Sequence, residues 1–419
     1  MRLSSPTSPT LLALAATAAS ALNLFVADYS GSITTLSLSE SNSSYTLDKT
    51  FETTACGPSP AWLTLDVNRG LLFCVNEGIT TPNGSLSSFT INANGSLHLI
   101  SNLTTLGGPV SSALYGNPAA AEHGIVLAHY GGSAVSTFTV SAGGNLTLNE
   151  EFVFEDMPSP GPDPERQDKP HPHQALLDPT GQYILVPDLG ADLVRIFGWD
   201  VADLKLKELE PLVADPGSGP RHIAFWTPQN IPGGTTYMYL VEELSSRVAG
   251  YAVQYSTDYS GLSFNPIGSQ STLGYHNLVR RNAPAEIQIS PDNKFLLVSN
   301  RNSTAFTLPD PEIGPSDSIS TFQLCPNTGS LSARHHQLSP SGGLYPRHFA
   351  TNSAGNLVAA ALQLSGSVVI LERDTATGLM MLEPVARIAI PANVTTVMWD
   401  EVARSGVTGL TGMGVGLGF

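Results

Sequence analysis

Charged side chains are scarce in this chain of 419 residues, and basic ones are the scarcer kind. Only 13% of the residues are charged, against about 25% in an average globular domain. The 35 acidic residues outnumber the 19 Lys and Arg residues, which gives a formal net charge of −16. Nucleic acids and anionic membrane surfaces attract basic proteins. The charge balance therefore argues against both as partners.

Cysteine and long apolar stretches are also rare. Three cysteines in a chain of this length exclude a disulfide scaffold. In an oxidising compartment one pair can bridge, and Cys56 and Cys74 are the closest in sequence. Cys74 lies in the apolar run LLFCV, so a buried free thiol is an equal alternative. After the N-terminal region no apolar stretch reaches about 18 residues, which predicts no membrane span.

The first 21 residues have the pattern of a secretory signal peptide. Arg2 supplies a positive start, Leu11–Ala19 is a short apolar run, and Ala19-Ser20-Ala21 is a small-residue cleavage site. We expect cleavage after Ala21 and a secreted, extracellular protein. Sequons for N-glycans agree with this expectation, and they lie at Asn42, Asn83, Asn94, Asn102, Asn145, Asn302 and Asn393.

The body of the chain is rich in turns, with 39 Gly and 31 Pro, and it carries one theme repeatedly. The theme is a small or Pro-containing entry, a short apolar strand, a turn, a second apolar strand, and a third strand of alternating polarity. The copies are spaced roughly 47 to 65 residues apart, close to the length of a propeller blade with loop insertions. They start at Pro58, Gly108, His171, Gly219, Ala283 and Tyr345.

The two ends of the chain supply one more repeat. Leu24–Ser39 resembles the later strands of a repeat, and Val394–Glu401 resembles a first strand with nothing after it. Joined, they form one blade and remove the open edges of the ring. We therefore predict an all-β fold, a seven-bladed β-propeller over residues 22–402, followed by a loose Gly-rich tail at 403–419. A six-bladed ring is the structural alternative.

Unusual polar residues cluster at equivalent points of these repeats. Some open a repeat and others follow its second strand, so a shared phase places their side chains at one end of the central channel. Histidine moves protons near neutral pH, and arginine binds carboxylates or an oxyanion. No metal-binding or cofactor-binding motif is present, and we expect neither a metal nor a cofactor. The candidates are His171, His173, Asp188, Arg221, Glu242, Glu243, Arg301 and Arg347.

At these same positions the chain resembles the seven-bladed β-propeller lactonases. This family includes bacterial 6-phosphogluconolactonases and fungal carboxy-cis,cis-muconate cyclases. The resemblance covers essentially the whole mature chain, and the PERQ, HPHQ and PDLGAD motifs are its most specific part. It is carried by Gly161–Phe197, Ser218–Phe225, Tyr239–Tyr251, Ala283–Asn302 and Tyr345–Ala350.

The resemblance implies a role for each matching residue. His173 corresponds to the active-site histidine, Arg221 and Arg301 to its two arginines, and Glu243 to its glutamate. Glu242 departs from the family, which usually has asparagine there; an extra carboxylate is expected to raise a neighbouring pKa or repel an anionic substrate. We assign the first four, His173, Arg221, Arg301 and Glu243, to catalysis. The residues that we assign to substrate binding are His171, Arg347, Asp188 and Glu242.

Two functions follow from this assignment. The first is an enzyme that opens or closes the ring of a small lactone or dicarboxylate, with His173 or Glu243 activating water and the arginines holding the oxyanion. Because phosphorylated sugar lactones are intracellular, secretion favours an unphosphorylated substrate. The second is a non-catalytic propeller that binds a glycan or a protein.

Overall fold

The structure is a computed structural model, and it describes residues 22–117, 120–155, 157–229, 231, 233–256, 261–274, 282–309 and 314–402. The expected signal peptide and the expected Gly-rich tail lie outside the described residues. Within them, no helix is long and apolar enough to cross a membrane.

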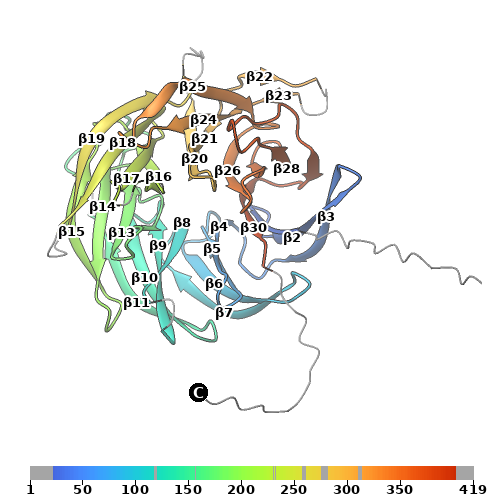
Figure 1. Ribbon diagram of the computed structural model, residues 1–419. Coiled ribbons are helices and arrows are strands. Elements are labelled where there is room, and N and C mark those ends of the chain that lie inside the picture. Colours follow the sequence, from blue (N-terminus) through green and yellow to red (C-terminus); the bar gives the residue numbers. More distant parts are fainter. Residues whose placement is uncertain are drawn as a thin grey trace, which may run out of the picture.

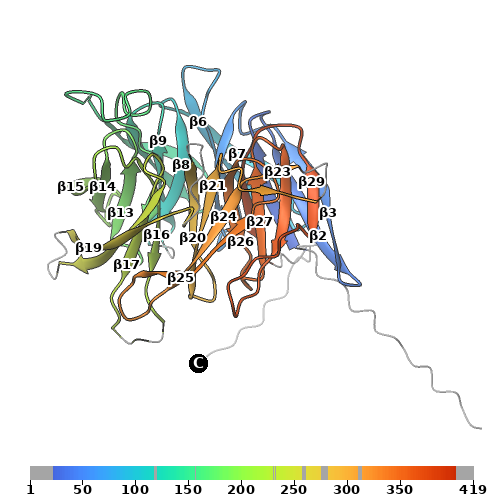
Figure 2. The ribbon, with the colours of Figure 1, turned by 90° about the horizontal axis from the view of Figure 1, so that it is seen from above.

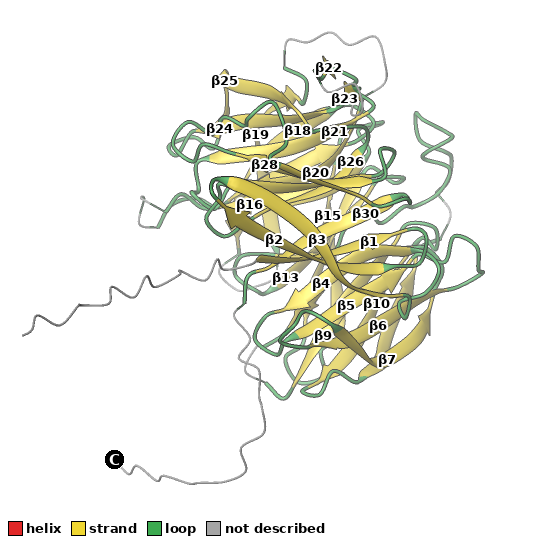
Figure 3. Cartoon of the chain, turned by 90° about the vertical axis from the view of Figure 1, so that its right-hand side faces the viewer, coloured by secondary structure: helices red, strands yellow, loops and turns green. Residues whose placement is uncertain are grey.

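Seven four-stranded antiparallel sheets surround a central axis in the described part of the chain (Figure 1). Strands and loops make up all of it, as the colouring of Figure 3 shows. The fold prediction of an all-β, seven-bladed propeller is therefore confirmed, and the six-bladed alternative is excluded. In chain order the strands are β1 (Leu22–Asp28), β2 (Ile33–Ser41), β3 (Ser44–Thr53), β4 (Pro60–Asp66), β5 (Leu71–Asn76), β6 (Gly84–Ile91), β7 (Leu97–Thr105), β8 (Pro109–Tyr115), β9 (Glu122–His129), β10 (Ala134–Ser141), β11 (Leu146–Val153), β12 (Leu176–Leu177), β13 (Tyr183–Asp188), β14 (Leu193–Trp199), β15 (Leu206–Val213), β16 (Pro220–Trp226), β17 (Tyr237–Glu242), β18 (Arg247–Tyr255), β19 (Leu262–Ser271), β20 (Ala283–Ile289), β21 (Phe295–Arg301), β22 (Phe306–Thr307), β23 (Pro315–Ser316), β24 (Ser318–Leu324), β25 (Leu331–Pro340), β26 (Pro346–Thr351), β27 (Leu357–Leu362), β28 (Ser367–Glu372), β29 (Ala386–Ala389) and β30 (Val394–Asp400).

The two ends of the chain close the ring in one sheet, as the sequence predicts. The sheet has the order β3-β2-β1-β30, so the last strand lies innermost and the first three strands lie outside it. β1 and β30 are antiparallel, with Val26 opposite Val397 and Leu24 opposite Trp399. This pairing leaves the ring without an unpaired inner edge.

The hydrophobic core is divided among the blade interfaces. Seven buried clusters each join two neighbouring sheets, and Figure 2 shows the sheets standing side by side around the ring. Strands buried on both faces need apolar residues throughout, which explains the uninterrupted runs of the second strands such as LLFCV in β5. The core therefore holds the blades rigidly around the channel.

A β-bulge recurs at the start of the innermost strands. Four of these strands, β4, β8, β16 and β26, begin with a proline that pairs with the second strand, and the register then shifts by one residue, as at Pro60, Pro220 and Pro346. Proline has no N–H for the ladder, and a bulge re-aims the side chains next to it. The residues in and just after the bulge, such as Arg221 and His222, consequently differ in direction from those of a regular strand.

Cys56 and Cys74 form a disulfide, with their Cα atoms 6.0 Å apart. The bond ties the segment before β4 to β5, and both sulfurs are buried. Of the two alternatives that the sequence leaves open, the structure has the bridge. Cys325 is a half-buried free thiol.

Candidate active site

A buried carboxylate lies at the centre of the cluster at one end of the channel. Glu243 follows β17, and its side chain is held by arginines from three other parts of the chain. Its Oε2 atom is 2.9 Å from Nε of Arg221 in β16 and 2.5 Å from Nη2 of Arg301 at the end of β21. Its Oε1 atom accepts a hydrogen bond of 2.7 Å from Nη2 of Arg166. The structure thus brings three of the predicted residues together and adds a fourth.

The charges in this cluster determine whether the Glu243 carboxyl is ionised. Burial by itself raises the pKa of the Glu243 carboxyl, but Arg301, Arg166 and Arg221 outweigh it and hold the pKa well below its usual range. Burial and the charge of Arg301 lower the pKa of Arg221 to about 9, against the opposing effect of Glu243. Glu243 is therefore a fixed anion whose oxygens are already occupied by guanidinium groups.

His173 lies beside this cluster as a neutral imidazole. Its backbone N–H donates to the Pro187 carbonyl at 2.8 Å, which holds it against β13, and its side chain is buried. Burial and the charges of Arg221, Arg347 and Arg301 place the pKa of His173 well below its usual value. A neutral ring in this position can accept a proton.

Arg347, in the bulge of β26, faces the same end of the channel with its charge uncompensated by a direct ion pair in the described part of the chain. Its guanidinium lies 5.5 Å from the centre of the Tyr29 ring, and the Tyr29 hydroxyl donates a hydrogen bond to Glu77. This arrangement leaves the Arg347 guanidinium available for an anionic group.

The segment from Gly161 to Lys169 carries Arg166 over the mouth of the channel. It is anchored by Gln167, which is fully buried and donates through its amide to the Leu189 carbonyl at 3.0 Å. The segment also passes directly over Gly190, where an added Cβ would lie 1.8 Å from the Lys169 carbonyl oxygen. Only glycine fits such an approach, which explains the glycine of the PDLGAD motif.

His171 supports the cluster without reaching its centre. Its ring stacks on Tyr130 at 4.2 Å, and its Nε2 lies 2.9 Å from the Asp168 carboxylate. Tyr130 in turn packs edge-to-face with the His173 ring, and the two ring centroids are 5.5 Å apart. The Tyr130 hydroxyl accepts a hydrogen bond of 3.3 Å from Arg166 Nε. His171 therefore positions Tyr130 and the segment that carries Arg166.

Asp188 and Glu242, which the sequence assigns to substrate binding, lie outside the cluster around Glu243. Asp188 accepts backbone N–H groups of His171 and Ala191 and forms an ion pair of 2.9 Å with Arg195. Glu242 accepts a hydrogen bond from Ser245 and lines a separate hollow near Arg247. Successive strand residues face opposite sides, so the residue after each second strand, such as Glu243, faces the channel instead.

The extra carboxylate of Glu242 consequently has little effect on Glu243. Burial, with the charges of Asp215 and Asp192, raises the pKa of Glu242 itself, while Ser245 and Arg247 act against this. Its influence stays within the neighbouring hollow. Of the two carboxylates, Glu242 has the raised pKa, and Glu242 is not among the main causes that set the pKa of Glu243.

Sequence reasoning missed three contributors to the site: Arg166, Tyr130 and Glu286. Arg166 belongs to the PERQ motif, and Tyr130 follows the second strand of its blade just as Glu243 does, so the repeat phase could have revealed it. Glu286 lies in the bulge of β20, where the register shifts between Pro284 and Ile287.

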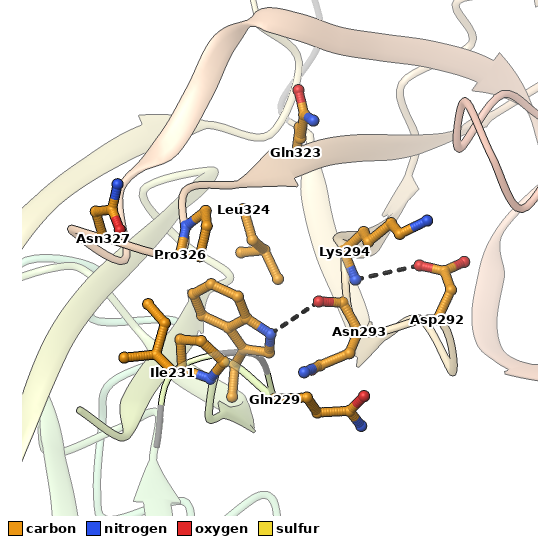
Figure 4. Close-up of a pocket in the computed structure, with 11 residues that line it drawn as sticks. Gln229, Ile231, Asp292, Asn293, Lys294, Gln323, Leu324, Pro326 and Asn327 are labelled. Atoms are coloured by element: carbon orange, nitrogen blue, oxygen red, sulfur yellow. Dashed lines mark hydrogen bonds between the residues drawn. The ribbon is translucent and has the colours of Figure 1, made fainter. Parts of the chain in front are cut away.

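A hollow at the opposite end of the ring has a different character (Figure 4). Trp226 lines it and donates its indole N–H to the Asn293 carbonyl at 3.1 Å, and Asp292, another lining residue, is paired with Arg373 at 2.6 Å. The described residues that line it include neither histidine nor arginine. Its charged lining residues in the described part of the chain are Asp292 and Lys294, so it has no counterpart of the histidine and the clustered guanidinium groups of the channel. Among the residues that the structure describes, no group of three or more His, Cys, Asp or Glu could hold a metal ion.

Comparisons with known proteins agree with the geometry. The family profile "Lactonase, 7-bladed beta-propeller" matches residues 14–398. A probable 6-phosphogluconolactonase of Arthroderma benhamiae is 30% identical over 346 residues, which cover 83% of this chain and 82% of that protein. A 6-phosphogluconolactonase of Formosa agariphila is 30% identical over 339 residues, 77% of this chain and 84% of that protein.

Solved structures share the same ring. A putative 6-phosphogluconolactonase of Bacteroides fragilis aligns with a TM-score of 0.72 at 25% identity, covering 91% of this chain and 98% of that one. A periplasmic gluconolactonase of Pseudomonas aeruginosa has the same fold, with a TM-score of 0.73 at 24% identity over 91% of this chain and 99% of that one. On this evidence the chain belongs to the seven-bladed β-propeller lactonase family.

Proposed function

We propose that this protein hydrolyses a small lactone that carries an anionic group. The observation that supports the proposal is the arginine cage around Glu243 beside a neutral, buried His173. A lactone carbonyl gathers negative charge on its oxygen when water attacks, and buried guanidinium groups are strong stabilisers of such charge. The cluster therefore combines a proton acceptor with fixed positive charge.

The structure supports a division of labour between His173 and Glu243. Glu243 is held as an anion by Arg301, Arg166 and Arg221, which lower its pKa against the effect of burial. Both of its oxygens are also occupied by these groups. His173 is neutral and has no such partner on its Nδ1 atom within the described residues. We assign proton transfer to His173 and the alignment of the arginines to Glu243.

The proposed reaction is the attack of water on the lactone carbonyl. His173 takes a proton from water while the water oxygen bonds to the lactone carbonyl carbon, and the carbonyl oxygen becomes an oxyanion beside Arg221 and Arg301. The ring C–O bond breaks as the oxyanion collapses, and the proton passes from His173 to the ring oxygen, which leaves as an alcohol. In the cyclising direction the arginines would instead orient a carboxylate for attack on an alkene carbon, and His173 would deliver the proton to the neighbouring alkene carbon.

The charge of the site favours an anionic substrate. Three guanidinium groups share the single carboxylate of Glu243, and Arg347 has no direct ion pair in the described part of the chain. A substrate carboxylate near Arg347 would offset the positive charge that lowers the pKa of His173 and so make the imidazole a better base. Relatives carry the names 6-phosphogluconolactonase and gluconolactonase.

A panel of lactones tests the proposal. Acid release at constant pH is followed for glucono-δ-lactone, 6-phosphogluconolactone and a muconolactone, after subtraction of spontaneous hydrolysis. His173→Asn should lower kcat/KM by about 100- to 10,000-fold, the usual contribution of a general base. His98→Asn, in the exposed part of β7, is the matched control and should leave the rate unchanged. Failure of the wild-type protein on every lactone would favour the non-catalytic binding propeller.

We further infer that the protein is secreted and N-glycosylated. The support is the N-terminal pattern together with the surface position of the sequons, since all seven asparagines are exposed in the structure. In an extracellular setting an unphosphorylated, carboxylated lactone is the preferred substrate. Sequencing of the N-terminus of the secreted protein tests the first step, with Leu22 expected as the first residue.

A further inference from the structure

A second group of side chains lies next to Arg221 of the arginine cage. Trp62, His222 and His348 each follow the bulge of an innermost strand, and Glu286 lies in the bulge of β20. We call these four residues the inner ring. The Trp62 ring makes edge contacts with His348 at 4.9 Å and His222 at 5.7 Å, so residues from β4, β16 and β26 meet across the channel.

The hydrogen bonds of His348 fix where its proton lies. The backbone N–H of Val397 points at Nδ1 of His348 at 3.4 Å, and a backbone N–H can only donate. Nδ1 therefore carries no hydrogen. Burial and the charge of Arg221 lower the pKa of His348 to about 3, so the ring is neutral and its hydrogen is on Nε2. That N–H faces Glu286 Oε2 at 3.4 Å.

Glu286 also determines which nitrogen of His222 carries a hydrogen. Its Oε1 accepts the N–H of Ile287 at 3.1 Å, and its Oε2 lies 3.2 Å from Nδ1 of His222. Burial raises the pKa of Glu286 to about 8 although Arg221 opposes this, so the carboxyl carries a proton at neutral pH. Because the His348 N–H already points at Oε2, the acid proton has His222 Nδ1 as its acceptor. His222 then carries its own hydrogen on Nε2.

Three nitrogen atoms next to this series of hydrogen bonds have no hydrogen-bond partner of their own. They are buried, and they belong to neighbouring side chains: Nε2 of His222, Nη1 of Arg221 and Nδ1 of His173. The His173 and His222 rings are 5.1 Å apart, and Arg221 is the largest charge acting on both. Buried donors without a partner are rare in folded proteins. Such a gathering indicates a place where an oxygen atom of a ligand binds.

We propose that His222 is a further catalytic residue, whose Nε2–H hydrogen-bonds the substrate's carbonyl oxygen together with Arg221 as that oxygen becomes negative. Glu286 and His348 are positioning residues that keep the donor tautomer of His222. The inference rests on the proposed lactone opening and completes its site. It explains why a carboxyl and two imidazoles that take no part in proton transfer are buried below the cage.

The pH dependence of the rate tests the role of Glu286. Above about pH 8 the ionised carboxylate accepts a hydrogen from His222 Nδ1, so Nε2 loses its hydrogen and the rate falls. Glu286→Gln keeps a neutral donor towards His222, so it should keep most of kcat at pH 7 and lose the fall near pH 8, while the later fall that follows from the Arg221 pKa of about 9 remains. The groups that face Glu286 are Arg221 and His222 from β16 and His348 from β26, and they are unchanged in this variant. Glu122→Gln, at an exposed position of β9, is the control and should keep the wild-type profile.

A second experiment removes the hydrogen-bond donor of His222. His222→Leu should lower kcat by about 100- to 1,000-fold, the usual loss for one oxyanion donor, with little change in KM. His222→Gln, which retains an N–H donor, should recover part of that loss. A folded His222→Leu protein with wild-type kcat, or a Glu286→Gln protein with an unchanged alkaline fall, would overturn the proposal while leaving the lactonase function intact.

A readout without activity separates the two proposals. ¹⁵N NMR of the histidine rings at pH 7 should show His222 with its hydrogen on Nε2, and the hydrogen should move to Nδ1 as the pH rises through about 8. If the wild-type protein opens no lactone, the proposed function fails and this spectrum still decides the tautomer. A hydrogen on Nδ1 at pH 7 would contradict the inference.

Discussion

At the scale of single residues, the site depends on one carboxylate that cannot act as a base. Glu243 is buried, yet Arg166, Arg221 and Arg301 keep it ionised and hold its orientation. In exchange, the carboxylate holds three guanidinium groups together that would otherwise repel one another in a poorly solvated channel. The chemistry is left to His173 and to the free faces of the arginines.

Arg221 should not tolerate replacement by lysine. Its Nε pairs with Glu243 while its Nη1 has no partner, so one planar group serves the glutamate and the substrate at once. A lysine ammonium is a single point charge. Arg221→Lys should lower kcat/KM nearly as much as Arg221→Ala, by roughly 30- to 1,000-fold for a loss of about 2–4 kcal/mol. Rates and melting temperatures of both variants are the measurements; a lysine variant with wild-type turnover would place Arg221 among purely structural residues.

At the scale of elements, the bulge of the innermost strand is the device that builds the site. The same proline-then-bulge pattern recurs around the ring, and the blades differ in which residue occupies it: Arg221 and Arg347 in two of them, Glu286 in another. A bulge leaves the ladder intact on either side. The position is therefore free to carry polar residues without disturbing the blade core.

The segment that carries Arg166 should act as one unit. Gln167 anchors it and Arg166 reaches Glu243, so loss of either removes the same contact. Arg166→Ala and Gln167→Ala should each lower kcat/KM by about 10- to 100-fold, as expected for a lost charge-assisted hydrogen bond. In a double-mutant cycle the combined variant should lose little more than the worse single variant. Strictly additive losses would mean that the two residues act independently.

At the scale of the whole molecule, stability depends on closure by the last strand. β30 fills the innermost place of the first sheet, and Val394, Val397 and Trp399 are buried in the cluster that joins this sheet to its neighbour. Burial of one such side chain contributes about 1.5–3 kcal/mol. The strand therefore contributes an amount comparable to the about 5–15 kcal/mol that stabilises a typical domain.

Deletion from Ala392 onward should abolish cooperative folding. It removes β30 and exposes the inner edge of β1. A truncation after Val402 keeps every described strand and serves as the control, with an unchanged melting temperature. Trp399→Ala is a milder test and should cost about 3–5 kcal/mol. A cooperative transition at the wild-type temperature after the larger deletion would show that closure by the termini is dispensable.

N-glycans should occupy one face of three consecutive blades. Asn42, Asn94 and Asn145 lie in or beside the hairpins that join the third and fourth strands of these blades, and all three are exposed. Asn102 is exposed but lies within β7 and donates its amide to Ser87 at 2.7 Å. Peptide mass spectrometry of the secreted protein should find glycans on the three hairpin residues and none on Asn102. Occupancy of Asn102 alone would contradict this distribution.

The sequence alone determines the seven-bladed ring and the equivalent positions that polar residues occupy in its repeats. Apolar runs and turns repeat, the two ends complete one blade, and a shared phase brings Arg221, Arg301 and Arg347 to the same end of the channel. These features are local or periodic, so a single chain reveals them. The pairing of Cys56 with Cys74 stayed open at this level, because spacing alone does not fix the approach of two sulfurs.

Only the tertiary structure decides which side chains meet. A difference of one position places Glu243 in the channel and Glu242 in a separate hollow, because successive strand residues face opposite sides. Arg166 reaches Glu243 from 77 positions earlier in the chain. The state of Glu286 depends on burial and on neighbours from other blades, and these exist only once the ring is closed. Contacts of this kind follow from packing between blades, which no local pattern encodes.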